Sequence, residues 1–150
     1  MEETHSVKEK VKELFSVQKL AVLSTQREGQ PYTTLVAFAA SRDLEYLYFA
    51  TTRATRKYAN LKNDTRIAML MDNRSNEVAD FRYAMAATAV GRAEEIEDDE
   101  KEAAMEIYLF KHPHLREFVT SPTCALFKVE VRTYYVVNRF QDVMEIHLKP

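Results

Sequence analysis

The chain has 150 residues, of which 46% are hydrophobic and 11% aromatic, which suits one domain with a packed core and excludes intrinsic disorder. Its 21 basic and 23 acidic residues nearly balance, which argues against nucleic acid as a partner, because surfaces that bind nucleic acid carry a basic excess. The segment before Leu20 lacks the apolar core of a signal peptide, no apolar run is long enough to span a membrane, and Cys124 has no second cysteine to pair with. We therefore expect a single cytoplasmic domain, residues 1–150, with no membrane partner.

The first half of the chain alternates short apolar runs with turn residues. A small amphipathic helix is predicted first, because Val7, Val11 and Leu14 recur on one helical face. Strand patterns follow, and Gly29 and Asp43 lie in the turns between them. The predicted elements are, in order, a helix over residues 5–15, strands over 20–25, 32–39 and 45–51, a short basic helix through Lys62, a buried strand over 66–71 and a polar loop over 72–80.

Two long strand patterns dominate the second half. Residues 84–96 alternate in polarity, and Gly91 marks a bulge or a close backbone approach. Residues 123–139 form the strongest strand pattern in the chain, long enough to bend across a barrel and cover two positions of a sheet. The remaining predictions are a helix over 97–110, a further turn over 113–118 and an edge strand over 143–148. Together these elements predict a mainly β fold, a small antiparallel barrel of about six strands with peripheral helices.

The segment Thr51–Lys57 carries its charges at the wrong end of the helix that it opens. A helix N-terminus has unpaired N–H groups and partial positive charge, so each basic residue there costs roughly 0.3–1 kcal/mol. Three cations and three hydroxyls in this segment make sense if an anion completes the site, because a phosphate accepts backbone, hydroxyl and charge-assisted hydrogen bonds together. The alternative is a solvated basic helix end that pairs with the acidic residues 98–102.

Glycine usage restricts the kind of phosphate site. Gly29 and Gly91 are the only glycines of the chain, so neither a dinucleotide-binding glycine loop nor a P-loop can be written anywhere in it. A phosphate would therefore be held by side chains and a helix end.

Several runs of the chain stand out together. They are LAVLST, a Gly-x-Pro turn leading into PYTTLVAFA, LYFAT, TRKYANLKND, RIAMLM, VGRAEEI and, toward the C-terminus, HPHLREF and ALFKVEVRTYYVV. Together they resemble the pyridoxamine 5'-phosphate oxidase-like, flavin-binding split-barrel family, and the most specific part is the hydroxyl-rich turn with its Arg-Lys pair. The resemblance implies an antiparallel split β-barrel that binds flavin mononucleotide (FMN) and forms a homodimer with the flavin at the interface.

The resemblance also implies which residues bind the cofactor. The FMN phosphate would be held by Thr51, Thr55, Arg56 and Lys57, and the isoalloxazine ring would lie along Thr34, Leu35, Val36 and Ala37. Without the resemblance, the second group consists of ordinary strand residues. Asn73 belongs to a polar loop, and the alternative is that it contacts the ligand from the second protomer.

The sequence departs from the pyridoxamine phosphate oxidases proper. Thr34 and Ala39 stand near the positions where those enzymes place an Arg and a Lys, and the chain ends at Pro150 without Trp or the longer C-terminal segment of those enzymes. We therefore expect an FMN-dependent oxidoreductase of unknown substrate that is not a true pyridoxamine phosphate oxidase. Two alternatives stay open: a non-catalytic flavin-binding or electron-carrier module, and a related reductase that uses a deazaflavin.

No side chain is predicted to act as an indispensable acid, base or nucleophile, because a flavin accepts a hydride directly. His112 and His114 form an HxH pattern without further ligands at a fitting spacing, so we expect helix-end charge and surface packing and no metal site. Cys124 is expected to be a buried small hydrophobe. The aromatic residues Tyr134, Tyr135 and Phe140 are expected in the core or in a dimer interface.

Overall fold

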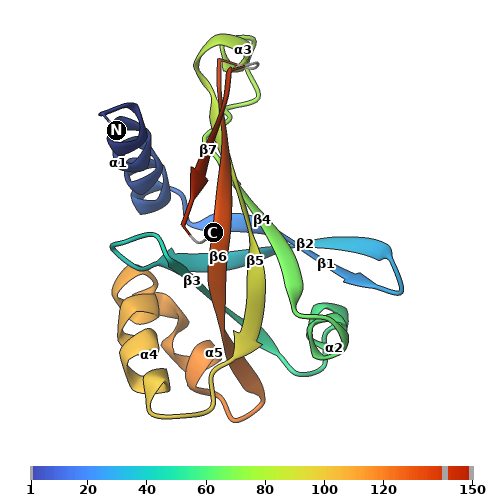
Figure 1. Cartoon of the computed structure of the whole chain (residues 1–150). Coiled ribbons are helices and arrows are strands. Elements are labelled where there is room, and N and C mark those ends of the chain that lie inside the picture. Colours follow the sequence, from blue (N-terminus) through green and yellow to red (C-terminus); the bar gives the residue numbers. More distant parts are fainter. Residues whose placement is uncertain (1, 140–141, 149–150) are drawn as a thin grey trace.

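A computed structural model of the chain describes residues 2–139 and 142–148 and shows a small β-barrel with helices around it (Figure 1). The strands are β1 (Leu20–Arg27), β2 (Gln30–Ala40), β3 (Tyr46–Thr52), β4 (Arg66–Asp72), β5 (Met85–Glu95), β6 (Cys124–Asn138) and β7 (Asp142–His147). The helices are α1 (Glu2–Val17), α2 (Arg56–Asn63), α3 (Asp80–Tyr83), α4 (Glu100–Lys111) and α5 (Arg116–Thr120), with a 3₁₀ turn, η1 (Pro113–Leu115), before α5. Within the described residues, none of the helices has the length and apolar character that a membrane crossing needs.

The strands form one antiparallel sheet that closes on itself. The strand order is β3-β2-β1-β4-β5-β6-β7, and β3 also pairs with β6, so six strands complete a barrel and β7 adds an edge to β6. Side chains of alternating polarity let each strand direct one side into the barrel. The predicted antiparallel barrel with peripheral helices is therefore confirmed.

The long strand β6 connects both ends of the sheet. Its first half pairs with β3, from Cys124 to Glu130, and its second half pairs with β7, from Thr133 to Asn138. Strand β5 runs along the other edge of β6. The prediction that this segment covers two positions of the sheet is therefore confirmed.

Gly91 lies where β5 shifts its register against β6. A Cβ atom at this position would come within 2.1 Å of the Glu130 carbonyl oxygen, so a side chain there would force the β6 backbone to move. The predicted bulge and close backbone approach are both present. The other glycine, Gly29, has a φ of +82° and follows Glu28 with a φ of +52°, the left-handed pair that suits a two-residue hairpin turn between β1 and β2.

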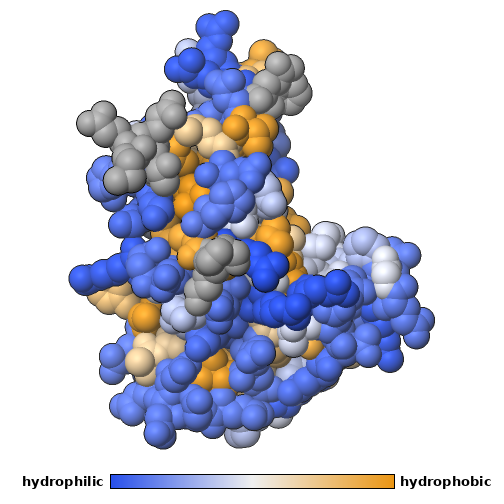
Figure 2. Space-filling model, in the orientation of Figure 1, coloured by the Kyte–Doolittle hydropathy of each residue, from blue (hydrophilic) through white to orange (hydrophobic). Residues whose placement is uncertain are grey.

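Buried side chains form two clusters. The larger one fills the barrel and extends beneath α1, where Val11 is completely buried. The smaller one lies beneath α4 and α5 and includes Tyr108 and Val119. Figure 1 shows α1 beside β7, α4 below β3, α5 beside the lower end of β6, and α2 beneath the β1–β2 hairpin. Figure 2 shows apolar side chains that reach the surface over the upper strands. Three methionines, Met69, Met71 and Met85, are also buried.

The structure differs from the predictions mainly where helices begin. Helix α4 begins at Glu100 and not at residue 97, because the Asp98 carboxylate accepts the Glu100 backbone N–H in a turn ahead of the helix. Helix α3 lies at the end of the predicted polar loop. It forms because the Asp80 carboxylate accepts hydrogen bonds from the backbone N–H groups of Ser75 and Asn76, which fold the loop back onto the helix start.

Candidate functional site

The N-terminus of α2 is open to an outside hydrogen-bond acceptor. Thr55 is the N-cap, and its Oγ1 accepts a hydrogen bond from the Tyr58 N–H at 3.2 Å. The Ala59 N–H donates to the Thr55 carbonyl, so the N–H groups of Arg56 and Lys57 precede the first helical bond and stay available. The start of α2 therefore has the geometry of an anion site.

Thr51 and Thr55 shape the turn that leads into α2. Their Oγ1 atoms lie 2.8 Å apart, and each lies close to the Thr52 carbonyl oxygen, at 3.0 and 3.2 Å. Thr51 is only 2% exposed. Both hydroxyls thus bond within the turn and hold the helix start in place, and their role as donors to a ligand stays a prediction.

Arg56 and Lys57 are the free cations of this helix end. Among the described residues, the neighbouring Arg53 and Lys62 form ion pairs, but Arg56 and Lys57 form none. The Arg56 guanidinium lies over the Tyr32 ring, with 5.6 Å between Cζ and the ring centroid. Lys57 is half-buried, and burial lowers the pKa of its ammonium group. A partly desolvated cation without a carboxylate is stabilised when an anion binds beside it.

Glu95 pairs with two nearby cations, Arg53 of this segment and Lys62 in the last turn of α2. Arg53 Nη2 donates to Glu95 Oε2 at 2.6 Å, and Lys62 Nζ lies 3.4 Å from Oε1. The Tyr58 hydroxyl donates to the same Oε1 at 3.0 Å. Burial alone would raise the pKa of the Glu95 carboxyl, but the hydrogen bonds from Arg53 and Tyr58 outweigh burial, and the pKa lies below its ordinary value.

These contacts correct two expectations about the basic segment. Within the described residues its ion pairs go to Glu95, and the acidic residues 98–102 are not its partners. Arg53 precedes the helix, which begins at Arg56, so Arg53 is not part of the first turn.

Packing of α2 on the β1–β2 hairpin brings the two predicted parts of the site together. Asn60 Nδ2 donates to Thr25 Oγ1 on β1 at 3.0 Å, and Arg56 covers Tyr32 on β2. Tyr32 and Thr34 share one face of β2, because side chains alternate along a strand. The start of α2 therefore lies beside the strand that is predicted to hold the flavin ring.

The predicted ring-binding residues occupy different environments. The Leu35 side chain is 61% exposed, whereas Val36 is buried in the barrel, so only the backbone of Val36 faces a ligand outside. Thr34 and Ala37 are half-buried. The Ala37 carbonyl accepts a hydrogen bond from the Tyr108 hydroxyl at 3.2 Å, which ties this part of β2 to α4.

Asn73 lies apart from the predicted residues at the start of α2 in the same chain. Strand β4 lies between α2 and Asn73 in the chain, so the two are at opposite ends of this strand. A strand of this length spans roughly 20 Å. The Asn73 Oδ1 accepts the Met85 N–H at 2.7 Å, and its own N–H donates to the Met85 carbonyl at 3.2 Å. Asn73 therefore closes the loop between β4 and β5, and only a second copy of the chain could bring it to the α2 site.

Sequence reasoning missed Tyr32 and Glu95. Glu95 meets Arg53 across 42 positions of the chain, because β5 and β3 lie on either side of β6. No local pattern signals such a contact. Tyr32 follows the turn between β1 and β2, but its position beneath Arg56 depends on how α2 packs.

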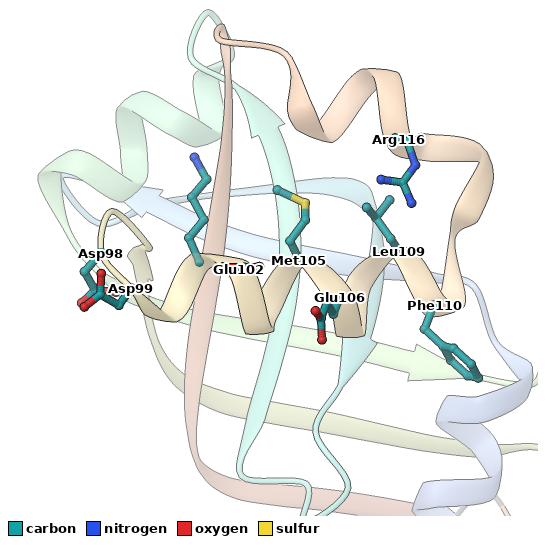
Figure 3. Close-up of a pocket in the computed structure, with 9 residues that line it drawn as sticks. Asp98, Asp99, Glu102, Met105, Glu106, Leu109, Phe110 and Arg116 are labelled. Carbon is teal, nitrogen blue, oxygen red and sulfur yellow. The ribbon is translucent and has the colours of Figure 1, made fainter.

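A broad hollow of about 990 Å³ lies elsewhere on the surface, along α4 (Figure 3). It is lined by Asp98, Asp99, Lys101, Glu102, Met105, Glu106, Leu109, Phe110 and Arg116. In Figure 3, Asp98 and Asp99 lie at one end of the hollow and Phe110 at the other. The carboxylates along it repel a phosphate, and no predicted cofactor residue lines it. The hollow therefore does not compete with α2 as the phosphate site.

His112 is buried, and the expectation of surface packing is wrong. Its Nε2 lies 2.7 Å from the Phe38 carbonyl oxygen, and since a carbonyl can only accept, Nε2 carries the hydrogen. Burial lowers the pKa of this imidazole, which favours the neutral ring. In the described part of the chain, no three His, Cys, Asp or Glu side chains gather so that they could hold a metal ion.

Cys124 and Tyr134 lie in the core, as expected. Tyr135 is 39% exposed, and Phe140 lies outside the described residues.

Comparison with known proteins gives a family and a set of related folds. A sequence model described as pyridoxamine 5'-phosphate oxidase matches residues 7–138. No curated protein matches the chain.

Three solved structures illustrate the likeness. A heme binding protein from Mycobacterium smegmatis has a TM-score of 0.82 and 18% identity, over 93% of this chain and 57% of that one. General Stress Protein 26 from Bacillus anthracis has a TM-score of 0.71 and 23% identity, over 95% and 98% of the two chains. An FAD-binding protein from Mesorhizobium loti has a TM-score of 0.68 and 16% identity, over 85% and 89%. The chain spans only 57% of the heme binding protein's length, and identities this low show a shared fold alone.

Proposed function

Because the chain belongs to the pyridoxamine 5'-phosphate oxidase family, we propose that it binds FMN between α2 and β2 and works as an FMN-dependent oxidoreductase. Its structural neighbours include a heme-binding and an FAD-binding protein, so related folds serve more than one cofactor. The proposal for FMN therefore rests on the residues of this chain. Residues 1–150 would form one cofactor-binding domain that acts in the cytoplasm.

The observation that carries the proposal is the pair of free cations at the start of α2. A phosphate monoester carries close to two negative charges at neutral pH, and Arg56 and Lys57 supply two positive charges without an acidic partner. The two available backbone N–H groups of the same residues would add donors for this anion. Thr51 and Thr55 keep this turn in shape. Heme has carboxylates and no phosphate, so the arrangement favours a flavin nucleotide.

The residues of β2 would orient the ring of the cofactor. The exposed Leu35 and the half-buried Ala37 lie on one face of β2 and the half-buried Thr34 on the other, so the ring would meet apolar side chains and backbone groups of this strand. When bound, the flavin supplies the hydride-accepting chemistry, and the protein supplies binding and orientation. No side chain is proposed as an acid, base or nucleophile.

A homodimer would complete this site. On the outer face of the barrel, paired positions form one row across five strands: Leu35, Val22, Leu70, Thr88 and Tyr135. The row is mostly apolar, and its ends, Leu35 and Tyr135, are 61% and 39% exposed. Such a face gains stability when a second copy covers it. The dimer would also bring Asn73 of one protomer toward the cofactor of the other.

Two other uses of a bound flavin compete with the oxidoreductase: a non-catalytic carrier or storage module, and a reductase that uses a deazaflavin. The ligand that co-purifies with the protein separates them. A yellow protein that releases FMN supports an oxidoreductase or a carrier, and substrate-dependent turnover then separates these two. A deazaflavin mass, or the absorption spectrum of heme, would contradict the proposal for FMN.

The phosphate site is tested by replacing both free cations, Arg56→Ala with Lys57→Ala. Each charge-assisted hydrogen bond is worth about 1.5–3 kcal/mol, so the FMN dissociation constant should rise a hundredfold or more. Riboflavin has no phosphate, so its weaker binding should change little. Titration of flavin fluorescence measures both ligands. The control replaces two exposed lysines of α1, Lys10→Ala with Lys12→Ala, and unchanged FMN affinity in the first variant would refute the assignment.

A further inference from the structure

Glu95 is a carboxylate that gathers three donors from one short segment. Its side chain is 6% exposed, and it accepts from Arg53, Tyr58 and Lys62. All three donors lie in or directly before α2. The proposed function does not use Glu95, yet this contact sets how the phosphate-binding helix is attached to the barrel.

The attachment fixes α2 from one side. Tyr58 and Lys62 are one turn apart, so they share a helix face, and Lys62 Nζ also lies 5.4 Å from the Tyr58 ring centroid. The Tyr58 ring packs edge-on against Phe127, at 5.9 Å between centroids, and Phe127 is the residue opposite Glu95 in the sheet. This face of α2 therefore rests on the end of β5 and on β6.

On its opposite face, α2 contacts the β1–β2 hairpin through Arg56 and Asn60, which are also one turn apart. Two attachments on different faces prevent the helix from turning about its axis. They leave Arg56 and Lys57 with their free N–H groups at the open end. Meanwhile Glu95 keeps Arg53 and Lys62 paired, so these cations do not draw the anion away from the helix start.

We propose that Glu95 is a positioning residue for the phosphate site, which holds α2 in the orientation that lets Arg56 and Lys57 bind a phosphate monoester. The inference rests on the proposed function, because it concerns the same site. Glu95 acts through Arg53, Tyr58 and Lys62 and does not touch the ligand.

The test replaces Glu95 with its neutral isostere, Glu95→Gln, and measures affinity for FMN and riboflavin by flavin fluorescence. Moderate salt in the buffer screens the two cations, Arg53 and Lys62, that lose their carboxylate partner in this variant. We expect the FMN dissociation constant to rise about tenfold and that of riboflavin to change less than twofold. A merely destabilised fold would weaken both ligands together, so the ratio of the riboflavin dissociation constant to the FMN dissociation constant reports the position of α2.

The matched control is Glu94→Gln, the exposed neighbour on the same strand, which should leave the ratio unchanged. If Glu95→Gln does not fold, Tyr58→Phe keeps the packing on Phe127, removes one hydrogen bond, and should lower the ratio about threefold. A ratio equal to that of the wild type in these variants overturns the inference while the phosphate site stands. A wild-type protein that binds FMN no better than riboflavin overturns the proposed site, and the inference with it.

Discussion

His112 illustrates how a residue type associated with catalysis can have a structural role. Its buried Nε2–H bonds the Phe38 carbonyl on β2, and the Tyr108 hydroxyl bonds the Ala37 carbonyl beside it. We expect His112→Ala to lower the free energy of unfolding by about 1–3 kcal/mol, because a buried carbonyl loses its donor. The rate of flavin reduction at full occupancy should stay within about tenfold of wild type, a barrier change below about 1.4 kcal/mol. Denaturant unfolding and stopped-flow reduction measure the two effects, with Tyr108→Phe as the control that removes only the neighbouring donor. A thousandfold loss of rate with full flavin would reveal an acid or base in the site.

Lys111 of α4 bonds to the end of α1, and burial lowers the pKa of its ammonium group. Lys111 Nζ donates to the Phe15 carbonyl at the end of α1 at 2.7 Å and lies 3.7 Å from the Phe38 ring centroid. Burial, with a smaller contribution from Lys19, lowers the pKa of Lys111 to about 8 from 10.5. As the pH rises through this interval, the folded chain loses the proton before the unfolded chain does, so Lys111 makes folding more favourable at higher pH. Between about pH 8 and about pH 10, the unfolding free energy of the wild type should rise by roughly 1 kcal/mol or more relative to Lys111→Met. Denaturant titrations of both proteins give this difference, and a difference that stays constant or falls with pH would contradict it.

The proposed dimer would form through the apolar row that crosses the outer face of the barrel. Leu70 lies in the middle of this row, between Val22 and Thr88. A lysine at this position would place a charge in the interface, where its desolvation is costly, so Leu70→Lys should dissociate the dimer at micromolar concentration and weaken FMN binding in step. Analytical ultracentrifugation gives the mass, and flavin fluorescence gives the affinity. Phe110→Lys, at a residue that is 92% exposed on α4, is the control and should stay dimeric. A wild-type monomer that binds FMN at full affinity would contradict a shared site.

Much of the fold could be predicted because its signals are local. Alternating polarity identified the strands, and the length of residues 123–139 indicated that β6 serves two positions in the sheet. Gly91 marked the close approach of β5 to β6. A helix start rich in cations indicated the candidate phosphate site from composition and order alone, since the helix dipole makes those charges unfavourable without an anion.

The tertiary fold was needed to show which of these cations are free. Glu95 forms ion pairs with Arg53 and Lys62, which are far from it in the sequence. Their pairing therefore depends on the closure of the barrel through β6. The length of β4 separates Asn73 from α2, and the packing of α4 on β2 buries His112. Periodicity, capping and charge order are properties of neighbouring residues and can be read along the chain. Burial and ion pairing depend on residues that meet only when distant strands pair, so they follow from the folded barrel.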